Sequence, residues 1–436
     1  MKPKLWVLVI GLWGVLGGCA SIEGVRQSNP TGLELGCATG DVTPNEATIW
    51  LKASGSESIQ VQYGIDSPSK RMISTSPISP TPDSNFTVKI NLSGLTPKTR
   101  YVYRAVVERK QPGPLCQFVT APSLDDFAQV VFVIGGDVRA SFRPFTIMNE
   151  MRSANPDFFL FVGDTIYSDK GKAAEKLADY WGKYWENRDP ATQGFLAKTS
   201  VYVMWDDHEV DSDFISTHPR MPVGRQAFFD YWPIRQNSED PYRLYRVFQW
   251  GQAVEFFLLD TRQYRDPSTH TMLGEVQKHW LMDRLNASLA KVKFIVTSVP
   301  ISDPGKDKWG EYNEERDEIL DYIGKQGITG VVFLATDVHH AAIAKVPGPL
   351  GLKELIFGPL AAPMNYWIDP QEPRFEYFHD QYQNYGKITV RPQESAPLLE
   401  VEWYGEDHRL LHRLVLESDA SGNLVSLTSE QSLGPR

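Results

Sequence analysis

Three short polar segments each follow directly after an apolar run of four or five residues, and no other feature constrains the fold of this chain as strongly. The polar segments span residues 163–167, 205–209 and 336–340, and the apolar runs span residues 158–162, 201–204 and 331–334. Runs of this length, bounded by polar or turn residues, are typical of buried strands. In a layered α/β sheet, the loops that leave the carboxyl ends of the strands converge at one edge. The pattern therefore predicts that the carboxylates, phenol and imidazoles of the three segments meet in one place.

The first third of the chain has a different pattern from the rest. Apolar and polar residues alternate in segments such as 47–51, 59–63 and 86–90. A period of two between regular turn signals predicts a small antiparallel sandwich. Residues 95–104 also resemble the tyrosine-corner strand of fibronectin type III domains. We therefore expect an all-β, immunoglobulin- or fibronectin-like sandwich domain over residues 33–122.

After residue 121, short strands alternate with longer helical patterns. Apolar residues recur at helical spacing over residues 274–289 and 314–323, which lie among strands such as 130–134 and 254–259. This alternation predicts an α/β domain over residues 127–436, with a mainly parallel sheet and helices on its faces. Strand-like alternation returns from residue 388, so we expect an antiparallel sheet to close the domain.

The N-terminus has the features of an export signal. Lys2 and Lys4 precede an apolar stretch that ends in Gly17-Gly18-Cys19. This resembles the lipobox of bacterial lipoproteins, which implies removal of a signal peptide of residues 1–18 and diacylation of Cys19. Residues 19–32 would then form a flexible tether, and the protein would be periplasmic or at the cell surface. Its anchor would lie in the outer membrane, whose sorting residues Ala20 and Ser21 resemble, or in the inner membrane. The alternative is an ordinary signal peptide with a chance cysteine.

The composition limits the partners of the chain. Its 436 residues carry a net charge of −10, so neither nucleic acid nor an anionic membrane face is expected as a broad electrostatic partner. An anionic substrate would have to be attracted locally, by metal ions or a few arginines. Besides Cys19 only Cys37 and Cys116 remain, and in an oxidising compartment they form either a disulfide or two free buried thiols.

The three polar segments also carry specific motifs. Gly-Asp-x-x-Tyr, Trp-Asp-Asp-His-Glu and Asp-Val-His occur in that order, together with Leu-Asp-Thr-Arg at residues 259–262 and a Leu-Gly-x-x-Gln-x-x-Trp-Leu segment at residues 273–281. This set resembles the PhoD-like alkaline phosphatases and phosphodiesterases among the calcineurin-like metallophosphoesterases. The resemblance implies a metallophosphoesterase α/β sandwich behind the N-terminal domain. It also implies hydrolysis of phosphomonoesters, phosphodiesters or both by metal-activated hydroxide.

The chemistry of the segments agrees with this class. A pair of cations about 3.5–4 Å apart can supply a nucleophilic oxygen at neutral pH and offset the charge of the phosphoryl oxygens. Oxygen ligands with a few imidazoles suit iron, manganese, zinc or calcium. By resemblance, we expect two or more ions, Fe³⁺ together with Ca²⁺, Mn²⁺ or Zn²⁺. The candidate metal ligands are Asp137, Asp164, Tyr167, Asp207, Asp337 and His339.

The resemblance also suggests individual roles for these ligands. Asp164 would bridge both ions, Tyr167 would bind the same ferric ion as a phenolate, and Asp207 would bind the second ion. Asp137 takes the position at which the family usually has a cysteine ligand. If residues 337–339 are extended, the side chains of Asp337 and His339 point to the same side.

Four further side chains lie near the predicted ligands. His208 is expected to contact phosphate or to donate a proton to the leaving group. Arg139 is a candidate phosphate contact. Arg262 could grip two phosphoryl oxygens with its planar fork, or it could pair with Asp260 or another carboxylate. In an extended segment, His340 points to the side opposite Asp337 and His339, so it is expected in the core or behind the ligands, with a metal-ligand role as the alternative.

Other functions remain open at this stage. A phospholipid-cleaving phosphodiesterase is favoured by the predicted anchor and by Tyr366 and Trp367, although these aromatics could equally form a packing cluster. A non-catalytic surface lipoprotein with a structural metal site is a second alternative. A serine hydrolase is remote because the chain has no Gly-x-Ser-x-Gly elbow. The physiological phosphoester substrate, small molecule or phospholipid, and the oligomeric state are not determined by the sequence.

Overall fold

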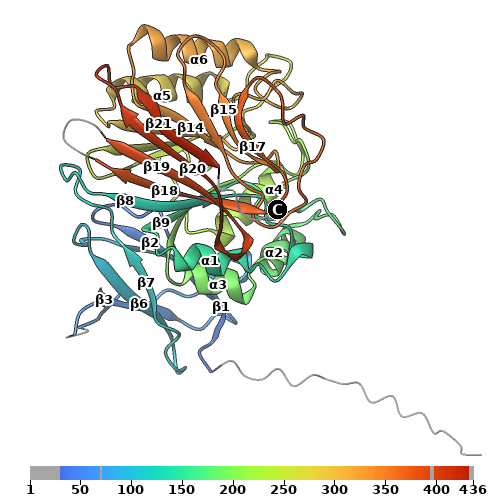
Figure 1. Cartoon of the computed structure of the whole chain (residues 1–436). Helices are drawn as coiled ribbons and strands as arrows, with labels where there is room; N and C mark the ends of the chain where they lie inside the picture. Colours follow the sequence, from blue (N-terminus) through green and yellow to red (C-terminus); the bar gives the residue numbers. More distant parts are fainter. Residues whose placement is uncertain (1–29, 69–70, 393–396, 432–436) are drawn as a thin grey trace, which may run out of the picture.

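The computed structural model describes residues 30–68, 71–392 and 397–431, and it contains two large sheets and one small sheet (Figure 1). The first large sheet has the strand order β21-β20-β19-β18-β8-β9-β10-β1-β2-β5. Its strands are β1 (Leu33–Gly40), β2 (Ala47–Ala53), β5 (Thr87–Leu92), β8 (Val130–Gly135), β9 (Phe158–Val162), β10 (Ser200–Met204), β18 (Asn384–Arg391), β19 (Leu398–Gly405), β20 (Arg409–Ser418) and β21 (Leu424–Gln431).

The second large sheet has the order β11-β12-β13-β14-β16-β15-β17. Its strands are β11 (Arg246–Trp250), β12 (Val254–Leu258), β13 (Val292–Val296), β14 (Val331–Ala335), β15 (Ala341–Lys345), β16 (Lys353–Ile356) and β17 (Phe375–His379). The small sheet, in the order β4-β3-β6-β7, is formed by β3 (Ile59–Ile65), β4 (Ile73–Ser74), β6 (Arg100–Val107) and β7 (Cys116–Val119).

Each large sheet is parallel at its centre. Strands β8, β9 and β10 are parallel neighbours in the first sheet, and β12, β13, β14 and β16 are parallel neighbours in the second. The expected single, mainly parallel sheet is therefore divided between two sheets. The expected closing antiparallel strands are present as β18 to β21, and they continue the first sheet because β18 pairs with β8. Periodicity identifies strands, but their partners are chosen by long-range packing that it does not encode.

The α/β region has four layers, with the two sheets inside and helices outside. Phe132 and Phe158 of the first sheet contact Phe256 of the second, with ring centroids 5.2 and 5.5 Å apart. The neighbouring Val133 and Phe159 face the opposite way, toward the helices, as the period of a strand requires. One helical layer is formed by α1 (Ile147–Ser153), α2 (Leu177–Glu186), α3 (Pro190–Leu196) and α4 (Met221–Tyr231), and the other by α5 (Gly274–Ala287) and α6 (Asn313–Lys325). Short 3₁₀ turns occur at Pro82–Ser84, Ala140–Phe142 and Glu406–His408.

The N-terminal strands form a sandwich that joins the first sheet. Strands β1, β2 and β5 pack against the small sheet, and β1 meets β10 through the pair Gly40 and Val201. A disulfide joins Cys37 on β1 to Cys116 on β7, the first and last strands of this region. The predicted signal peptide and Cys19 lie outside the described residues. In the part of the chain that is described, no helix combines the length and apolarity that crossing a membrane requires.

Candidate metal centre

The loops after four strand ends bring the predicted ligands together. Asp137 follows β8, Asp164 follows β9, Asp207 follows β10, and Asp337 and His339 follow β14. Their ligand atoms form three groups in which all atoms lie within 4.8 Å of one another. These groups are Asp137 with Asp164 and His339, Asp164 with Asp207 and His208, and Asp206 with Asp207 and Asp337. Asp164 and Asp207 each belong to two of the groups, as a bridging ligand would, and Asp164 joins the group of Asp137 to that of Asp207.

Four of the predicted ligands have left-handed backbone conformations. The φ angles are 62° at Asp137, 51° at Asp164, 70° at Asp337 and 56° at His339. Such angles are uncommon in residues other than glycine, and they concentrate at functional sites. An extended conformation was expected for the segment after β14, and the structure shows that this segment is not extended. Asp337 and His339 face different groups of ligands instead of the same one.

Asp137 is the least compensated of these carboxylates. It is fully buried, and neither of its carboxyl oxygens has a hydrogen-bond partner among the described residues. Burial, followed by the charges of Asp337 and Asp206, raises its pKa well above the ordinary value. Burial and the charge of Asp207 raise the pKa of Asp164 in the same way. Buried carboxylates without donors are strongly unfavourable unless a cation pairs with them, so the site fits bound metal ions.

The carboxylates of Asp207 and Asp337, in contrast, already have hydrogen-bond donors or positively charged side chains beside them. Asp207 accepts hydrogen bonds from the backbone of His208 at 2.9 Å and of Asp213 at 2.7 Å. Burial opposes its ionisation, but the charges of Arg262 and His208 outweigh burial and lower its pKa to about 2. Asp337 forms an ion pair with Lys308, yet burial still raises the pKa of Asp337 to about 7.

The imidazole of His339 is arranged as a neutral ligand. Its Nδ1 lies 2.5 Å from the carbonyl oxygen of Pro363, so Nδ1 carries the proton that it donates to this oxygen. Its Nε2 is then free of a proton and lies 2.9 Å from the Tyr167 hydroxyl and 3.7 Å from an oxygen of Asp137. Burial lowers the pKa of His339 to about 4, which keeps the ring neutral. A backbone carbonyl that fixes the tautomer in this way is typical of metal-binding histidines.

His208 and His340 have different surroundings. The Nδ1 of His208 lies 2.6 Å from Asp169, and its ring centroid lies 4.2 Å from that of Tyr167. Burial disfavours the charged ring, but Asp207 and Asp169 outweigh burial and raise the pKa of His208. His340 is buried against the ring of Phe378, away from the ligand groups, in agreement with its predicted core position.

Arg262 is enclosed by carboxylates. The side chain has no exposed surface, and its Nε donates to Asp206 at 2.5 Å while one terminal nitrogen donates to Asp307 at 2.9 Å. Another terminal nitrogen lies 3.9 Å from both Asp207 and Asp337. The ion-pair alternative therefore describes Arg262 better than the phosphate grip, and its partners are carboxylates other than Asp260, namely Asp206 and Asp307. Asp260 accepts a hydrogen bond from the backbone N–H of Arg262 but none from its guanidinium.

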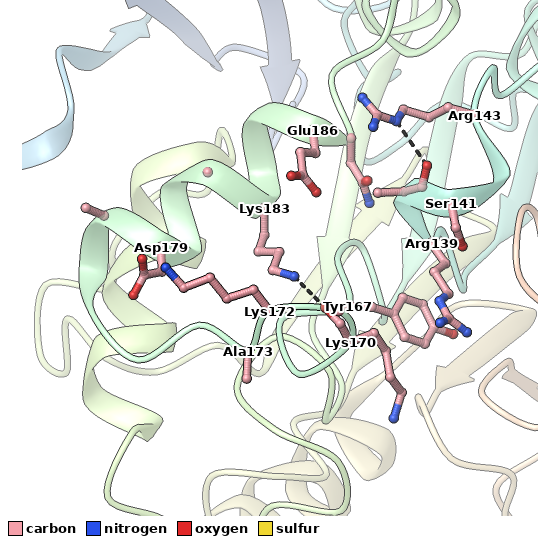
Figure 2. A pocket seen from close by; sticks show the side chains of 15 residues that line it. Arg139, Ser141, Arg143, Tyr167, Lys170, Lys172, Ala173, Asp179, Lys183 and Glu186 are labelled. Atoms are coloured by element: carbon pink, nitrogen blue, oxygen red, sulfur yellow. Dashed lines mark hydrogen bonds between the residues drawn. The ribbon is translucent and has the colours of Figure 1, made fainter.

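Arg139 remains available to a substrate. It is half-buried, and no carboxylate of the described residues lies within ion-pair distance of its guanidinium. It lines a cavity together with Tyr167 (Figure 2), whose hydroxyl also lies 2.9 Å from Nε2 of His339 in the centre.

Sequence reasoning missed three residues that shape the centre. Asp206 accepts from Arg262 and, at 2.7 Å, from Ser298, so its oxygens are occupied although it lies in a ligand group. Glu209 accepts the backbone N–H of Thr165 at 2.5 Å and of Asp206 at 2.8 Å, which ties the loop after β9 to the loop after β10. Both acids belong to the Trp-Asp-Asp-His-Glu motif and could have been assigned from it. No sequence signal marks Lys308.

Comparisons with known proteins agree with this geometry. A PhoD-like phosphatase model matches residues 133–396, and the N-terminal domain model of PhoD-like phosphatases matches residues 18–122. The chain belongs to the PhoD-like phosphatase family. Alkaline phosphatase D of Bacillus subtilis (strain 168) is 23% identical over 445 residues, which cover 83% of this chain and 76% of that protein.

Solved structures resemble the whole chain. A structure of PhoD aligns with a TM-score of 0.82 and 20% identity over 93% of this chain and 94% of the other. A purple acid phosphatase, PPD1 from yellow lupin (Lupinus luteus), aligns with a TM-score of 0.63 and 13% identity over 86% of this chain and 72% of the other. The predicted α/β metallophosphoesterase fold and the predicted enzyme class, a phosphoesterase, are confirmed.

Proposed function

We propose that this PhoD-like phosphatase hydrolyses phosphomonoesters or phosphodiesters at a two-metal centre in which Asp164 is shared by both ions. One observation carries the proposal: Asp164 belongs both to the group with Asp137 and His339 and to the group with Asp207 and His208. The first ion would be held by Asp137, Asp164, His339 and Tyr167. The second would be held by Asp164, Asp207 and Asp337.

Two bound ions supply a nucleophilic oxygen at neutral pH and offset the charge that grows on the phosphoryl oxygens. The chain fixes the geometry around them through the left-handed turns at Asp137 and Asp164 and through Glu209, which holds two of the loops. A phenol and a neutral imidazole beside two carboxylates suit Fe³⁺ at the first position. Oxygen donors at the second position suit Ca²⁺, Mn²⁺ or Zn²⁺.

His208 is proposed as the proton donor to the leaving group. Asp169 accepts from Nδ1 and orients the ring, which leaves a proton on Nε2 when the imidazole is charged. Arg139 is proposed to contact phosphoryl oxygens, since its guanidinium has no carboxylate partner at the edge of the site. Arg262 is proposed to act through Asp206 and Asp207, whose negative charge it offsets.

A phospholipid-cleaving phosphodiesterase is the second candidate. Tyr366 and Trp367 are 66% and 95% exposed. They follow Asn365, whose backbone N–H donates to the carbonyl oxygen of His339 at 2.9 Å, so the aromatic pair lies on a loop attached to the centre. This candidate accords with the proposed export as a lipoprotein, acylated at Cys19 and anchored to the outer membrane.

The test uses the metal-loaded protein with a phosphomonoester, a phosphodiester and a phospholipid. Asp164→Asn and Asp337→Ala should abolish turnover of every substrate that the wild type hydrolyses, while circular dichroism stays native. Asp321→Asn, which alters an exposed carboxylate on α6, is the control and should keep full activity. Full activity in Asp164→Asn would contradict the two-metal proposal. A folded wild-type protein without bound metal would favour the non-catalytic lipoprotein.

A further inference from the structure

A cavity of about 530 Å³ opens beside the metal centre, and none of the predicted metal ligands except Tyr167 lines it. Its walls come from the loop after β8, the loop after β9 and helix α2 (Figure 2). A volume of this size is in the range of sites for small molecules. The cavity is therefore large enough to hold a part of a substrate whose phosphoester lies at the centre.

The charge of this cavity is opposite to that of the chain. The chain carries a net charge of −10. Cationic side chains nevertheless dominate the lining, which includes Arg139, Arg143, Lys170, Lys172 and Lys183. Only two acidic residues, Asp179 and Glu186, line it as well. A local excess of positive charge on an acidic protein attracts and retains anions.

The acidic residues do little to neutralise these cations. The Asp179 carboxylate accepts the backbone N–H groups of Glu175 at 3.2 Å and Lys176 at 3.0 Å, at the start of α2. Lys170 has its own partner, Asp169, at 2.7 Å. Within the described ranges, no carboxylate lies at ion-pair distance from Arg139, Arg143 or Lys183. Three cations of the cavity therefore keep their charge available for a ligand.

Two of the cations are also held in place. Lys183 on α2 donates to the backbone oxygen of Lys170 at 2.6 Å, and the Nε of Arg143 donates to the backbone oxygen of Ala140 at 3.0 Å (Figure 2). Cations that are already positioned lose less conformational entropy when an anion binds. Among the described residues that line the cavity, Tyr167 is the only aromatic one, so the cavity does not suit a large apolar group.

We infer that this cavity binds a second phosphate group of the substrate while the phosphoester that is cleaved lies at the metal centre. The inference rests on the proposed function and names its substrate class: phosphoesters that carry another phosphate a few bonds from the reacting one. Arginine and lysine side chains recognise phosphate through charge-assisted hydrogen bonds, and arginine can do so with two bonds at once. Arg139 lies at the boundary between the cavity and the centre and can contact either phosphate.

The experiment compares propane-1,3-diol monophosphate with propane-1,3-diol bisphosphate as substrates of the metal-loaded enzyme. The wild type should show a KM for the bisphosphate at least tenfold below that for the monophosphate. The double variant Lys172→Gln with Lys183→Gln, and separately Arg143→Gln, should raise the KM of the bisphosphate by about tenfold and leave kcat and the monophosphate KM unchanged. The matched control, Lys198→Gln with Lys325→Gln, removes two exposed charges outside the cavity and should change neither KM.

The outcomes separate this inference from the proposed function. Equal KM values for both substrates in the wild type, or a KM for the bisphosphate that the variants do not change, would overturn the inference. If neither substrate is hydrolysed, the proposed function fails instead. Calorimetric titration of the bisphosphate into the wild type and the double variant then still decides the inference: tighter binding to the wild type supports it, and equal binding overturns it.

Discussion

Buried carboxylates occur in two regions of this molecule, and their surroundings differ. On strand β16 of the second sheet, Glu354 accepts the backbone N–H groups of Ile301 at 2.6 Å and Ser302 at 3.0 Å. In the metal centre, Asp137 is equally buried and has no donor at either oxygen.

Glu315, on α6, has its hydrogen bonds satisfied in the same way as Glu354. It accepts the backbone N–H groups of Met272 at 2.8 Å and Leu273 at 3.1 Å, just before α5 begins. Carboxylates of this kind fasten a loop to the core, because the buried N–H groups of the loop need acceptors. A carboxylate such as Asp137, left without donors in a protein that satisfies its other buried acids, is instead suited to a cation.

The largest expected difference between the regions is in catalysis. Asp137→Asn keeps the size of the side chain and removes its charge, so turnover should fall on the order of a thousandfold because the first ion loses a ligand. The free energy of unfolding of the metal-free protein should stay the same or rise, since one buried, uncompensated charge is gone. Steady-state kinetics and urea unfolding measure the two effects. Turnover within tenfold of the wild type would show that Asp137 is not a ligand.

Substitution of a carboxylate that accepts the N–H groups of a loop, such as Glu354, should lower stability and leave metal binding unchanged. Glu354→Ala leaves the N–H groups of Ile301 and Ser302 without acceptors and creates a cavity, which should lower the free energy of unfolding by about 2–4 kcal/mol. Metal content should remain that of the wild type. Urea unfolding and elemental analysis test this pair of results. A variant that loses its metal but keeps its stability would show that Glu354 holds metal and does not fasten a loop.

Metal removal sharpens the same distinction. Chelation should lower the melting temperature of the wild type, because ions that bind only the folded state stabilise it, by about 2.7 kcal/mol at a hundred times the dissociation constant. The shift should shrink in Asp137→Asn and persist in Glu315→Gln. Differential scanning calorimetry with and without chelator measures it. An identical shift in both variants would mean that the metal binds elsewhere.

The last expected difference is a dependence on pH. Burial raises the pKa of Glu354 from 4.5 to about 7 in the folded protein. Between these values the unfolded chain releases this proton and the folded chain keeps it, so the group costs stability as the pH rises from about 4.5 to about 7. Glu354→Gln cannot ionise, and its unfolding free energy should fall less steeply over this range than that of the wild type. Urea unfolding of both proteins at several pH values, with metal bound, provides the comparison, and parallel curves would contradict it.

Much of the centre could be predicted because its ligands lie in short motifs beside strong strand signals. The apolar runs before Asp164, Asp207 and Asp337 became β9, β10 and β14 with nearly the predicted bounds. Loops at the carboxyl ends of parallel strands converge for general reasons of topology, so the meeting of these residues follows from local patterns.

Other features depend on contacts that local patterns do not carry. Asp206 and Asp207 are adjacent acids, and only the fold decides that Arg262 occupies the oxygens of Asp206. Asp307, the second partner of Arg262, lies in a loop without a motif. The left-handed turns at Asp337 and His339 could not be foreseen either, because residues other than glycine adopt them only when the surrounding structure imposes them.

The most direct test of the shared centre is a crystal structure of the metal-loaded protein, with anomalous difference density collected for the bound ions. Two peaks about 3.5–4 Å apart are expected, both beside the carboxylate of Asp164. A single peak, or two peaks of which only one contacts Asp164, would contradict a centre in which this residue joins two ions.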